Sequence, residues 1–183
     1  MKNVLVMTDT VACIPDDLAI KHGIAVVPAA NILFDGQQYI DGVTINASEA
    51  YELIRKDPDK FITSAISPAF LLEEFRNLGT EHGKILFITL SSNLSGLSNT
   101  ARLAVDLYNS ESPRTTIEVF DSKNCAGGQG IMVLAAARAA EKGLSLEELV
   151  DYTAKIRERT DGVMLLDTLR YAYRTGRISK VGA

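Results

Sequence analysis

The feature that most constrains this fold is an alternation of short apolar runs with longer helical patterns. Several of the runs lack polar residues, as expected for strands that are buried on both faces of a sheet. The stretches between them place apolar residues on one helix face, for example Leu71, Phe75 and Leu78. Such alternation predicts an α/β fold, with a mostly parallel sheet and helices on both of its faces. The predicted strands are Val4–Met7, Ala25–Val27, Ile85–Ile88, Ile117–Phe120 and Val163–Leu166.

Local signals refine this outline. Asp35-Gly36 stands between two short apolar segments and is typical of a β-hairpin turn, so residues 29–46 interrupt the strand–helix rhythm. Residues Ile131–Ala140 are apolar almost all round, which predicts a central helix. Ser145 followed by Glu148 is a capping-box pattern and predicts the start of the next helix.

Composition limits the possible classes of protein. The 183 residues are 46% apolar, enough for a domain with a buried core. The 19 basic and 23 acidic residues give a net charge of −4, which excludes a protein that grips nucleic acid or anionic membranes mainly by electrostatics. The longest apolar run, Ile131–Ala137, is far shorter than the ~20 residues of a membrane helix, so we expect no stable membrane insertion. Cys13 and Cys125 are isolated, and we expect a soluble cytoplasmic protein without disulfides.

Hydroxyl groups gather where ligands usually bind in such folds. In open parallel sheets ligands lie beyond the carboxyl ends of the strands. Ser, Thr and Asp at these places commonly cap the next helix, which explains any one of them taken alone. Two positions indicate more. Ser95-Gly96 opens a helix, and its glycine lets a ligand come close to backbone N–H groups. Thr63-Ser64 lies just before Ser67-Pro68, a cap and a first-turn proline.

Together these two segments predict an anion site. Two helix N-termini with free hydroxyl groups offer N–H donors and the positive ends of two helix dipoles. Neither segment contains Lys or Arg, which favours a single carboxylate over a phosphate that needs charge neutralisation. We therefore predict a carboxylate-binding site formed by Thr63, Ser64, Ser95 and Gly96, with no catalytic residue and no metal.

Other motifs are weaker. Gly127-Gly128-Gln129-Gly130 is rich in glycine, but Val133 stands where a dinucleotide fingerprint needs its last glycine, and no phosphate-loop motif follows. We therefore predict no cofactor, and expect the glycines to let a helix pack closely. His22 and His82 each precede a glycine at an expected helix end. We interpret both as structural, which leaves no base for a Ser-His-Asp triad.

A second hypothesis assigns an enzyme activity. Asp9, Asp121 and Asp167 all follow predicted strands, and three carboxylates that converge can bind a magnesium ion. The protein would then be a magnesium-dependent phosphotransferase or hydrolase. All three residues also stand where helix caps are needed, which is the simpler explanation.

A set of motifs occurs along the whole chain in a characteristic order and spacing, and this set resembles the DegV family. The resemblance implies a two-domain α/β protein that binds one long-chain fatty acid between its domains. It implies that the Thr-Ser and Ser-Gly segments hold the carboxylate, that the protein itself is not catalytic, and that a partner fatty acid kinase phosphorylates the acyl chain. The motifs are Thr8-Asp9-Thr10, Thr63-Ser64-Ala65-Ile66-Ser67, Ser92-Asn93-Leu94-Ser95-Gly96, Asp121-Ser122 with Gly128-x-Gly130, and Leu169…Gly176-Arg177-Ile178.

The chain also departs from the usual pattern of that family. The family has Gln-Pro at Ala65-Ile66, Thr at Leu97 and Gly at Thr175. From the resemblance we expect the family's second domain to be missing after residue 183. We therefore predict residues 1–160 as the α/β domain that binds the head group, and residues 161–183 as the start of a truncated second domain.

A truncated second domain would leave the carboxyl edge of the sheet uncovered. By prediction, Ile66, Phe70 and Leu97 lie beside that edge and contact the acyl tail. An exposed apolar face of this kind usually finds a partner. We therefore expect either self-association through the uncovered interdomain face or an unstructured tail from about Tyr171 onward.

Overall fold

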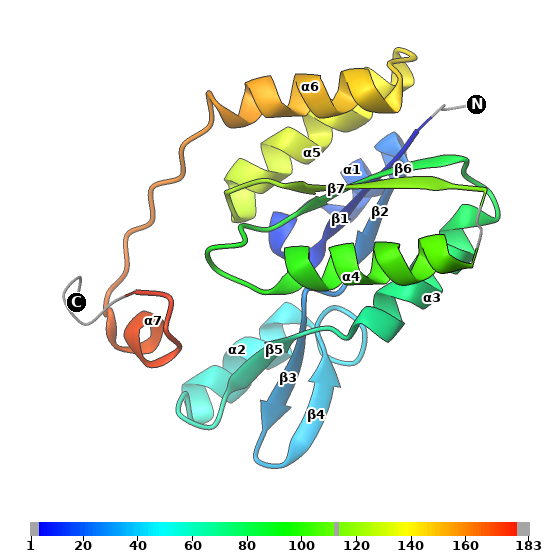
Figure 1. Cartoon of the computed structure of the whole chain (residues 1–183). Helices are drawn as coiled ribbons and strands as arrows, with labels where there is room; N and C mark the ends of the chain where they lie inside the picture. The colour runs from blue at the N-terminus through cyan, green and yellow to red at the C-terminus, as the bar shows by residue number, and fades with distance from the viewer. Residues whose placement is uncertain (1–3, 112–113, 179–183) are drawn as a thin grey trace.

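The computed structural model describes residues 4–111 and 114–178, which form two sheets flanked by helices (Figure 1). The strands are β1 (Leu5–Asp9), β2 (Ile24–Val27), β3 (Ala30–Phe34), β4 (Gln37–Ile40), β5 (Ile62–Ala65), β6 (Lys84–Thr89) and β7 (Thr116–Asp121). The helices are the short 3-10 turn η1 (Thr10–Ala12), α1 (Asp16–His22), α2 (Ala47–Lys56), α3 (Pro68–Gly79), α4 (Leu97–Ser110), α5 (Ala126–Glu141), α6 (Leu146–Arg157) and α7 (Arg170–Arg174).

The larger sheet is parallel, with four strands in the order β2-β1-β6-β7. Its central strands β1 and β6 are almost wholly buried, because α3 and α4 pack on one face and α1, α5 and α6 on the other (Figure 1). Phe75 of α3 meets Phe87 of β6 edge to face, with 6.1 Å between ring centroids. The predicted α/β architecture is thereby confirmed, and α5 is central, as its apolar sequence predicts.

Four of the five predicted strands are confirmed, as β1, β2, β6 and β7. The prediction for Val163–Leu166 is wrong. This segment crosses the surface without pairing to a described strand, and Val163 and Leu165 expose 97% and 99% of their surface. Apolar and β-branched residues favour an extended backbone, but a strand also needs the edge of a partner strand. This segment pairs with no strand edge among residues 4–111 and 114–178.

The smaller sheet is antiparallel and has the strand order β4-β3-β5. Asp35-Gly36 is confirmed as the hairpin turn between β3 and β4, with φ angles of 50° and 83°. Both angles are positive, as the tight turn that matches the twist of a hairpin requires. Thr63-Ser64, expected in a loop, lies in β5 instead, on the other side of β3. The mostly exposed sequence Ile62–Ala65 has no continuous apolar run that would have predicted this strand.

Two predicted helix starts are confirmed. The Ser67 hydroxyl accepts a hydrogen bond from the Phe70 N–H at 3.2 Å, and Pro68 occupies the first turn of α3. Ser145 and Glu148 form the complete capping box of α6. These caps satisfy N–H groups that the helix itself leaves without a partner.

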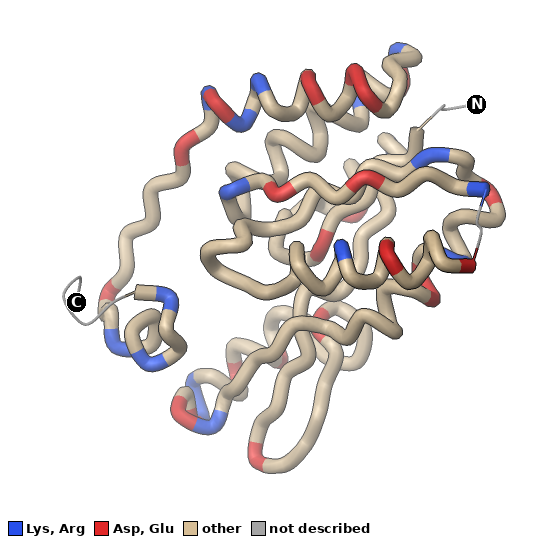
Figure 2. Tube along the Cα trace, viewed as in Figure 1, with Lys and Arg blue, Asp and Glu red and all other residues tan. Residues whose placement is uncertain are grey.

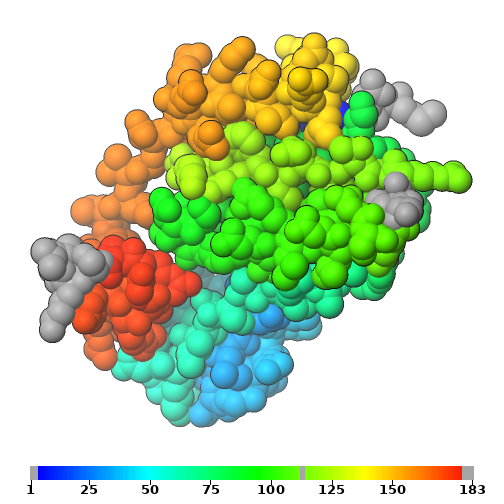
Figure 3. All heavy atoms as spheres, viewed as in Figure 1, coloured from blue at the N-terminus to red at the C-terminus, as the bar shows by residue number. Residues whose placement is uncertain are grey.

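After α6, residues 160–169 run along the surface to α7, which lies beside the end of α2 (Figures 1 and 3). Arg170 and Arg174 of α7 both form ion pairs with Asp59, in the turn between α2 and β5. The prediction of an unstructured tail from about Tyr171 is therefore wrong as far as residue 178. Residues 179–183 lie outside the described residues, and the predicted domain boundary at residue 160 stays a prediction.

Charges of both signs are spread along the surface helices, and three arginines gather at α7: Arg170, Arg174 and Arg177 (Figure 2). In the part of the chain that the structure describes, no helix combines the length and the apolar character that a membrane span requires.

Candidate functional site

A pocket of about 350 Å³ lies between the smaller sheet and the carboxyl edge of the parallel sheet. One wall is the apolar stripe of α2, where Ala47, Ala50, Tyr51 and Ile54 follow helical spacing. Other walls come from β3, from η1 and from the loop after β6. The lining is mostly apolar with a few polar groups, which is the usual character of a small-molecule site.

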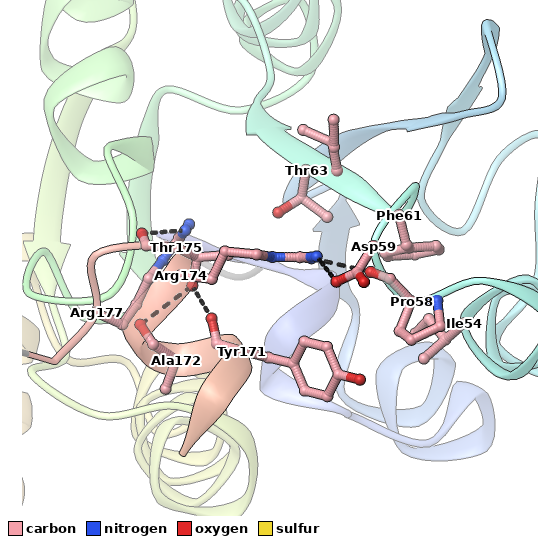
Figure 4. Close-up of a pocket in the computed structure, with 11 residues that line it drawn as sticks. Ile54, Pro58, Asp59, Phe61, Thr63, Tyr171, Ala172, Arg174, Thr175 and Arg177 are labelled. Carbon is pink, nitrogen blue, oxygen red and sulfur yellow. Dashed lines mark hydrogen bonds and ion pairs between the residues drawn. The ribbon is translucent and has the colours of Figure 1, made fainter. Parts of the chain in front are cut away.

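A second, larger cavity of about 700 Å³ adjoins the first (Figure 4). The two share Ile54, Phe61, Thr63 and Arg177 in their linings. Helix α7 forms one side of the larger cavity, and the turn between α2 and β5 forms the other. The two cavities are therefore continuous, and Thr63 and Arg177 are the polar residues that line both of them.

Thr63 lines both cavities, and its position follows from the strand that carries it. In β5, Thr63 is opposite Ile32 of β3, which also lines the pocket. Successive residues of a strand point to opposite faces, so Ser64 is on the other face, opposite Asn31. Ser64 lines neither cavity. Of the predicted Thr-Ser pair, only Thr63 is therefore brought to the pocket.

Ser95 reaches the same pocket from the loop between β6 and α4. Its hydroxyl oxygen accepts a hydrogen bond from the Leu97 N–H at 3.2 Å, which leaves the hydroxyl proton able to donate to a ligand. Gly96 follows directly before α4, and the space where a side chain would stand is open. A carboxylate can therefore approach the N-terminus of α4 closely, where the helix dipole favours negative charge.

Arg177 is the functional candidate that the sequence analysis missed. It lines both cavities, and its guanidinium donates to the Leu94 carbonyl at 3.1 Å and to the Thr175 carbonyl at 2.8 Å. The predicted site had no cation, but Arg177 brings one beside Ser95 in the folded chain, because residues after α7 return to the Ser95 loop. Arg177 was visible in the sequence only as part of the Gly176-Arg177-Ile178 motif.

Asp41 also lines the smaller pocket, and its carboxylate accepts a hydrogen bond from the Thr10 hydroxyl. A bound carboxylate is repelled by this group and attracted by Arg177. The electrostatics therefore favour an anionic head group near Thr63, Ser95 and Arg177.

The residues predicted to contact an acyl tail lie elsewhere. Ile66 and Leu97 are buried in the core between the parallel sheet and α3 and α4, and Phe70 is partly buried against the same core. None of the three lines either cavity. Their contact with an acyl tail stays a prediction, and the apolar walls of the two cavities come from α2, β3 and Phe61.

The three predicted metal ligands do not converge. No group of His, Cys, Asp and Glu residues that could hold a metal ion occurs in the described ranges. Asp167 is exposed on the segment before α7. The magnesium-dependent enzyme hypothesis is therefore not supported.

Asp9 and Asp121 instead bind the backbone of nearby loops. Burial raises the pKa of Asp9 to about 6, although hydrogen bonds from the Leu90 N–H, Gln129 and the Val11 N–H oppose the rise. Desolvation also acts to raise the pKa of Asp121, but hydrogen bonds from Lys123 and Ser92 outweigh it and lower that pKa to about 2.

The remaining sequence candidates are structural. His22 ends α1 directly before Gly23, whose φ of 50° closes the helix as predicted, whereas His82 lies beyond the end of α3. The glycine-rich segment is the first part of α5. A side chain at Gly130 would stand 2.7 Å from the Ala12 carbonyl oxygen, so the glycine permits close packing of α5 on η1.

Comparison with known proteins places this fold and pocket in a family. The model of the DegV family, described as "Uncharacterised protein, DegV family", matches residues 3–183. The chain belongs to the DegV family. A DegV domain-containing protein of Caldanaerobacter subterraneus subsp. tengcongensis is 38% identical over 180 residues, which are 98% of this chain and 62% of the relative.

Solved DegV structures share the fold. The structure described as fatty acid binding of a DegV family protein from Thermus thermophilus has a TM-score of 0.83 at 27% identity, covering 98% of this chain and 62% of that one. A fatty acid (stearic acid)-binding protein from Eubacterium ventriosum has a TM-score of 0.75 at 28% identity, covering 84% and 52%. This chain thus spans less than two thirds of the length of these relatives.

Proposed function

We propose that this chain binds a long-chain fatty acid, with its carboxylate at Thr63, Ser95, Gly96 and Arg177. The observation that carries the proposal is the meeting of Thr63 and Ser95, 32 positions apart, on one apolar pocket beside Arg177. The fatty-acid binding described for the DegV proteins of Thermus thermophilus and Eubacterium ventriosum supports the same conclusion.

The physical chemistry of the pocket fits this ligand. Burial of an alkyl chain contributes about 0.8 kcal/mol for each methylene that leaves water, so the apolar walls supply most of the affinity. The hydroxyl groups, the N-terminus of α4 and Arg177 fix the charged end, because hydrogen bonds to a charged group are stronger than those between neutral groups. The ligand would lie with its head at the junction of the two cavities.

The remaining parts of the prediction concern partners. We propose that the chain is not catalytic and that a fatty acid kinase phosphorylates the presented acyl chain. The support for this proposal is a lining of hydrogen-bond donors and apolar walls, which suits binding and presentation of a lipid. The test measures formation of acyl-phosphate from ATP. We expect the product only when such a kinase is added, and its formation by the chain alone would overturn the proposal.

The segment after residue 160 supports a proposal about domain organisation. Its exposed apolar residues have the pattern of a strand but lack a partner in the described chain, and the matched relatives are longer than this chain. We infer that residues 161–183 begin a second domain, and that the chain self-associates through the uncovered interdomain face. Sedimentation at increasing concentration measures this, and a monomer at every concentration would contradict it.

Substitutions at the head group test the binding proposal. We expect Ser95→Ala to weaken binding of a C16 or C18 fatty acid by about 1–3 kcal/mol, because the carboxylate loses a hydrogen-bond donor. Thr63→Ala should act similarly, and the pair should be non-additive because both residues contact one carboxylate. The measurements are native mass spectrometry of the protein with bound lipid and displacement of a fluorescent fatty acid.

Ser64→Ala is the matched control, since Ser64 is on the opposite face of β5 from Thr63. It should leave fatty-acid affinity unchanged. Loss of affinity in Ser64→Ala but not in Thr63→Ala would show that the other face of β5 carries the ligand. A parent protein that neither carries nor binds any fatty acid would overturn the proposed function itself.

A further inference from the structure

The loop that carries Ser95 is held at its start by two carboxylates from neighbouring strands. The Leu90 N–H donates to Oδ2 of Asp9, at the end of β1, across 2.8 Å. The Ser92 N–H donates to Oδ1 of Asp121, at the end of β7, across 3.1 Å. The loop is therefore anchored from both sides of β6, close to where Ser95 enters the pocket.

Asp9 has a second role that Asp121 does not share. Its Oδ1 accepts a hydrogen bond from the Val11 N–H at 3.0 Å, in η1. Val11 and Leu90 both line the smaller pocket, so a single carboxylate holds the backbone of two of its walls. Gln129 of α5 donates to Asp9 Oδ2 at 2.9 Å and ties this junction to the central helix.

We propose that Asp9 is a positioning residue for the fatty-acid site, which sets the place of Ser95 by holding Leu90 and Val11 against the end of β1. The inference rests on the proposed function, and it deepens that function by assigning a role to a buried residue that does not line the pocket. Asp9 acts through the loop and makes no contact with the ligand.

The arrangement of donors explains why a carboxylate is needed at this position. Oδ2 of Asp9 faces two donors, the Leu90 N–H and the Gln129 amide. An ionised carboxylate accepts both, whereas the NH₂ group of an asparagine would place a third donor against them. An uncharged isostere therefore loses at least one bond to the pocket walls.

The surroundings of Asp9 make its ionisation sensitive to pH. The pKa of Asp9 is raised to about 6, mainly by desolvation and to a smaller extent by the negative charge of Asp41, which directly follows β4. The contacts made to Asp9 from α5, η1 and the loop after β6 are neutral donors, in the described part of the chain. The hydrogen bonds from Val11 and Leu90 to Asp9, here called the Asp9 clamp, should therefore weaken on mild acidification. The bond between Asp121 and Ser92 should persist, because the pKa of Asp121 is about 2.

Gln129 offers an alternative partner to the protonated acid. Its amide nitrogen donates to Asp9 and to the Thr8 hydroxyl, but its buried Oε1 has no hydrogen-bond partner among the described atoms. A protonated Asp9 can donate a hydrogen bond to Gln129 Oε1 once the Gln129 amide group flips. Protonation thus reverses the direction of the hydrogen bond between Asp9 and Gln129 of α5, and it weakens the bonds from Asp9 to the pocket walls.

The first test uses the unmodified chain and needs no ligand. The amide proton shifts of Val11 and Leu90, followed by NMR between about pH 4.5 and about pH 7.5, should titrate with one common midpoint near the pKa of Asp9. The Ser92 amide should stay constant over the same range. Separate midpoints, or no titration at Val11 and Leu90, would overturn the clamp whether or not the protein binds fatty acid.

The second test measures coupling between residues at neutral pH. Asp9→Asn should weaken fatty-acid binding about tenfold. In double-mutant cycles this loss should couple more strongly to Ser95→Ala than to Thr63→Ala, because Asp9 holds the loop that carries Ser95 whereas β5 carries Thr63. A general loss of stability would couple equally to both residues, and that result would overturn the proposal.

Two further variants keep this test decisive. Thr153→Val changes a buried polar residue of α6, far from the pocket, and should lower stability without changing affinity. If Asp9→Asn fails to fold, Gln129→Met removes one bond to Asp9 and should show the same selective coupling to Ser95, in weaker form. Uniform coupling of Gln129→Met to Ser95 and Thr63 would contradict the proposal, whereas a parent that binds no fatty acid would refute only the function on which it rests.

Discussion

The two sheets of this protein differ in how completely they are buried, and the site lies where they meet. In the parallel sheet, all of β1 and nearly all of β6 are buried between two layers of helices. In the antiparallel sheet, β4 and most of β5 are exposed or half-buried, and α2 beside it has no fully buried residue. Ser95 follows a strand of the parallel sheet, whereas Thr63 belongs to the antiparallel sheet.

This contrast suggests a division of labour in the binding site. A segment with few buried contacts opens at a lower free energy than a fully packed core. The parallel sheet therefore fixes the Ser95 loop, while the smaller sheet and α2 would be able to adjust to the length and shape of the ligand's acyl tail in the proposed complex. Regions that must admit a ligand are expected at the less stable end of a fold.

The largest expected effect is in the parallel sheet. Phe87→Ala removes a fully buried ring that packs on Phe75, and it should lower the free energy of unfolding by about 3–5 kcal/mol. In β5, more than half of the Ile62 side chain is already exposed, so Ile62→Ala should lower the free energy of unfolding by at most about 0.5 kcal/mol. Urea unfolding of both variants measures this difference. Equal losses of unfolding free energy would contradict the distinction between the two sheets.

A smaller effect sharpens the comparison within the antiparallel sheet. Gly36→Ala places a side chain at a φ of 83°, where L-residues are strained, although the space around it is open. We expect Gly36→Ala to destabilise the β3–β4 hairpin by about 1–2 kcal/mol. The effect should appear as faster hydrogen exchange in β3 and β4 only. Gly83→Ala, also in open space but without a positive φ, is the matched control. Faster exchange in β1 and β6 of Gly36→Ala would mean that the two sheets unfold as one unit.

Much of the fold could be predicted because its signals are local. The strands of the parallel sheet are short apolar runs, and the Ser67 and Ser145 caps act on N–H groups within three residues. The Asp35-Gly36 turn needs only two residues that tolerate positive φ. The α2 stripe of Ala47, Ala50, Tyr51 and Ile54 is another local signal, and helical periodicity would have identified it as one apolar face of a helix.

By itself, the sequence determined the α/β architecture, the hairpin and helix caps, and the presence of hydroxyl groups at Thr63 and Ser95. Only the tertiary structure decided which of them share a pocket. Strand pairing turned Thr63 toward the pocket and Ser64 to the opposite face of β5, and the return of the chain after α7 brought Arg177 to a site whose own loops have no cation. It also left Val163–Leu166 unpaired in the described chain, because a strand depends on hydrogen bonds to a distant edge that local propensity cannot supply.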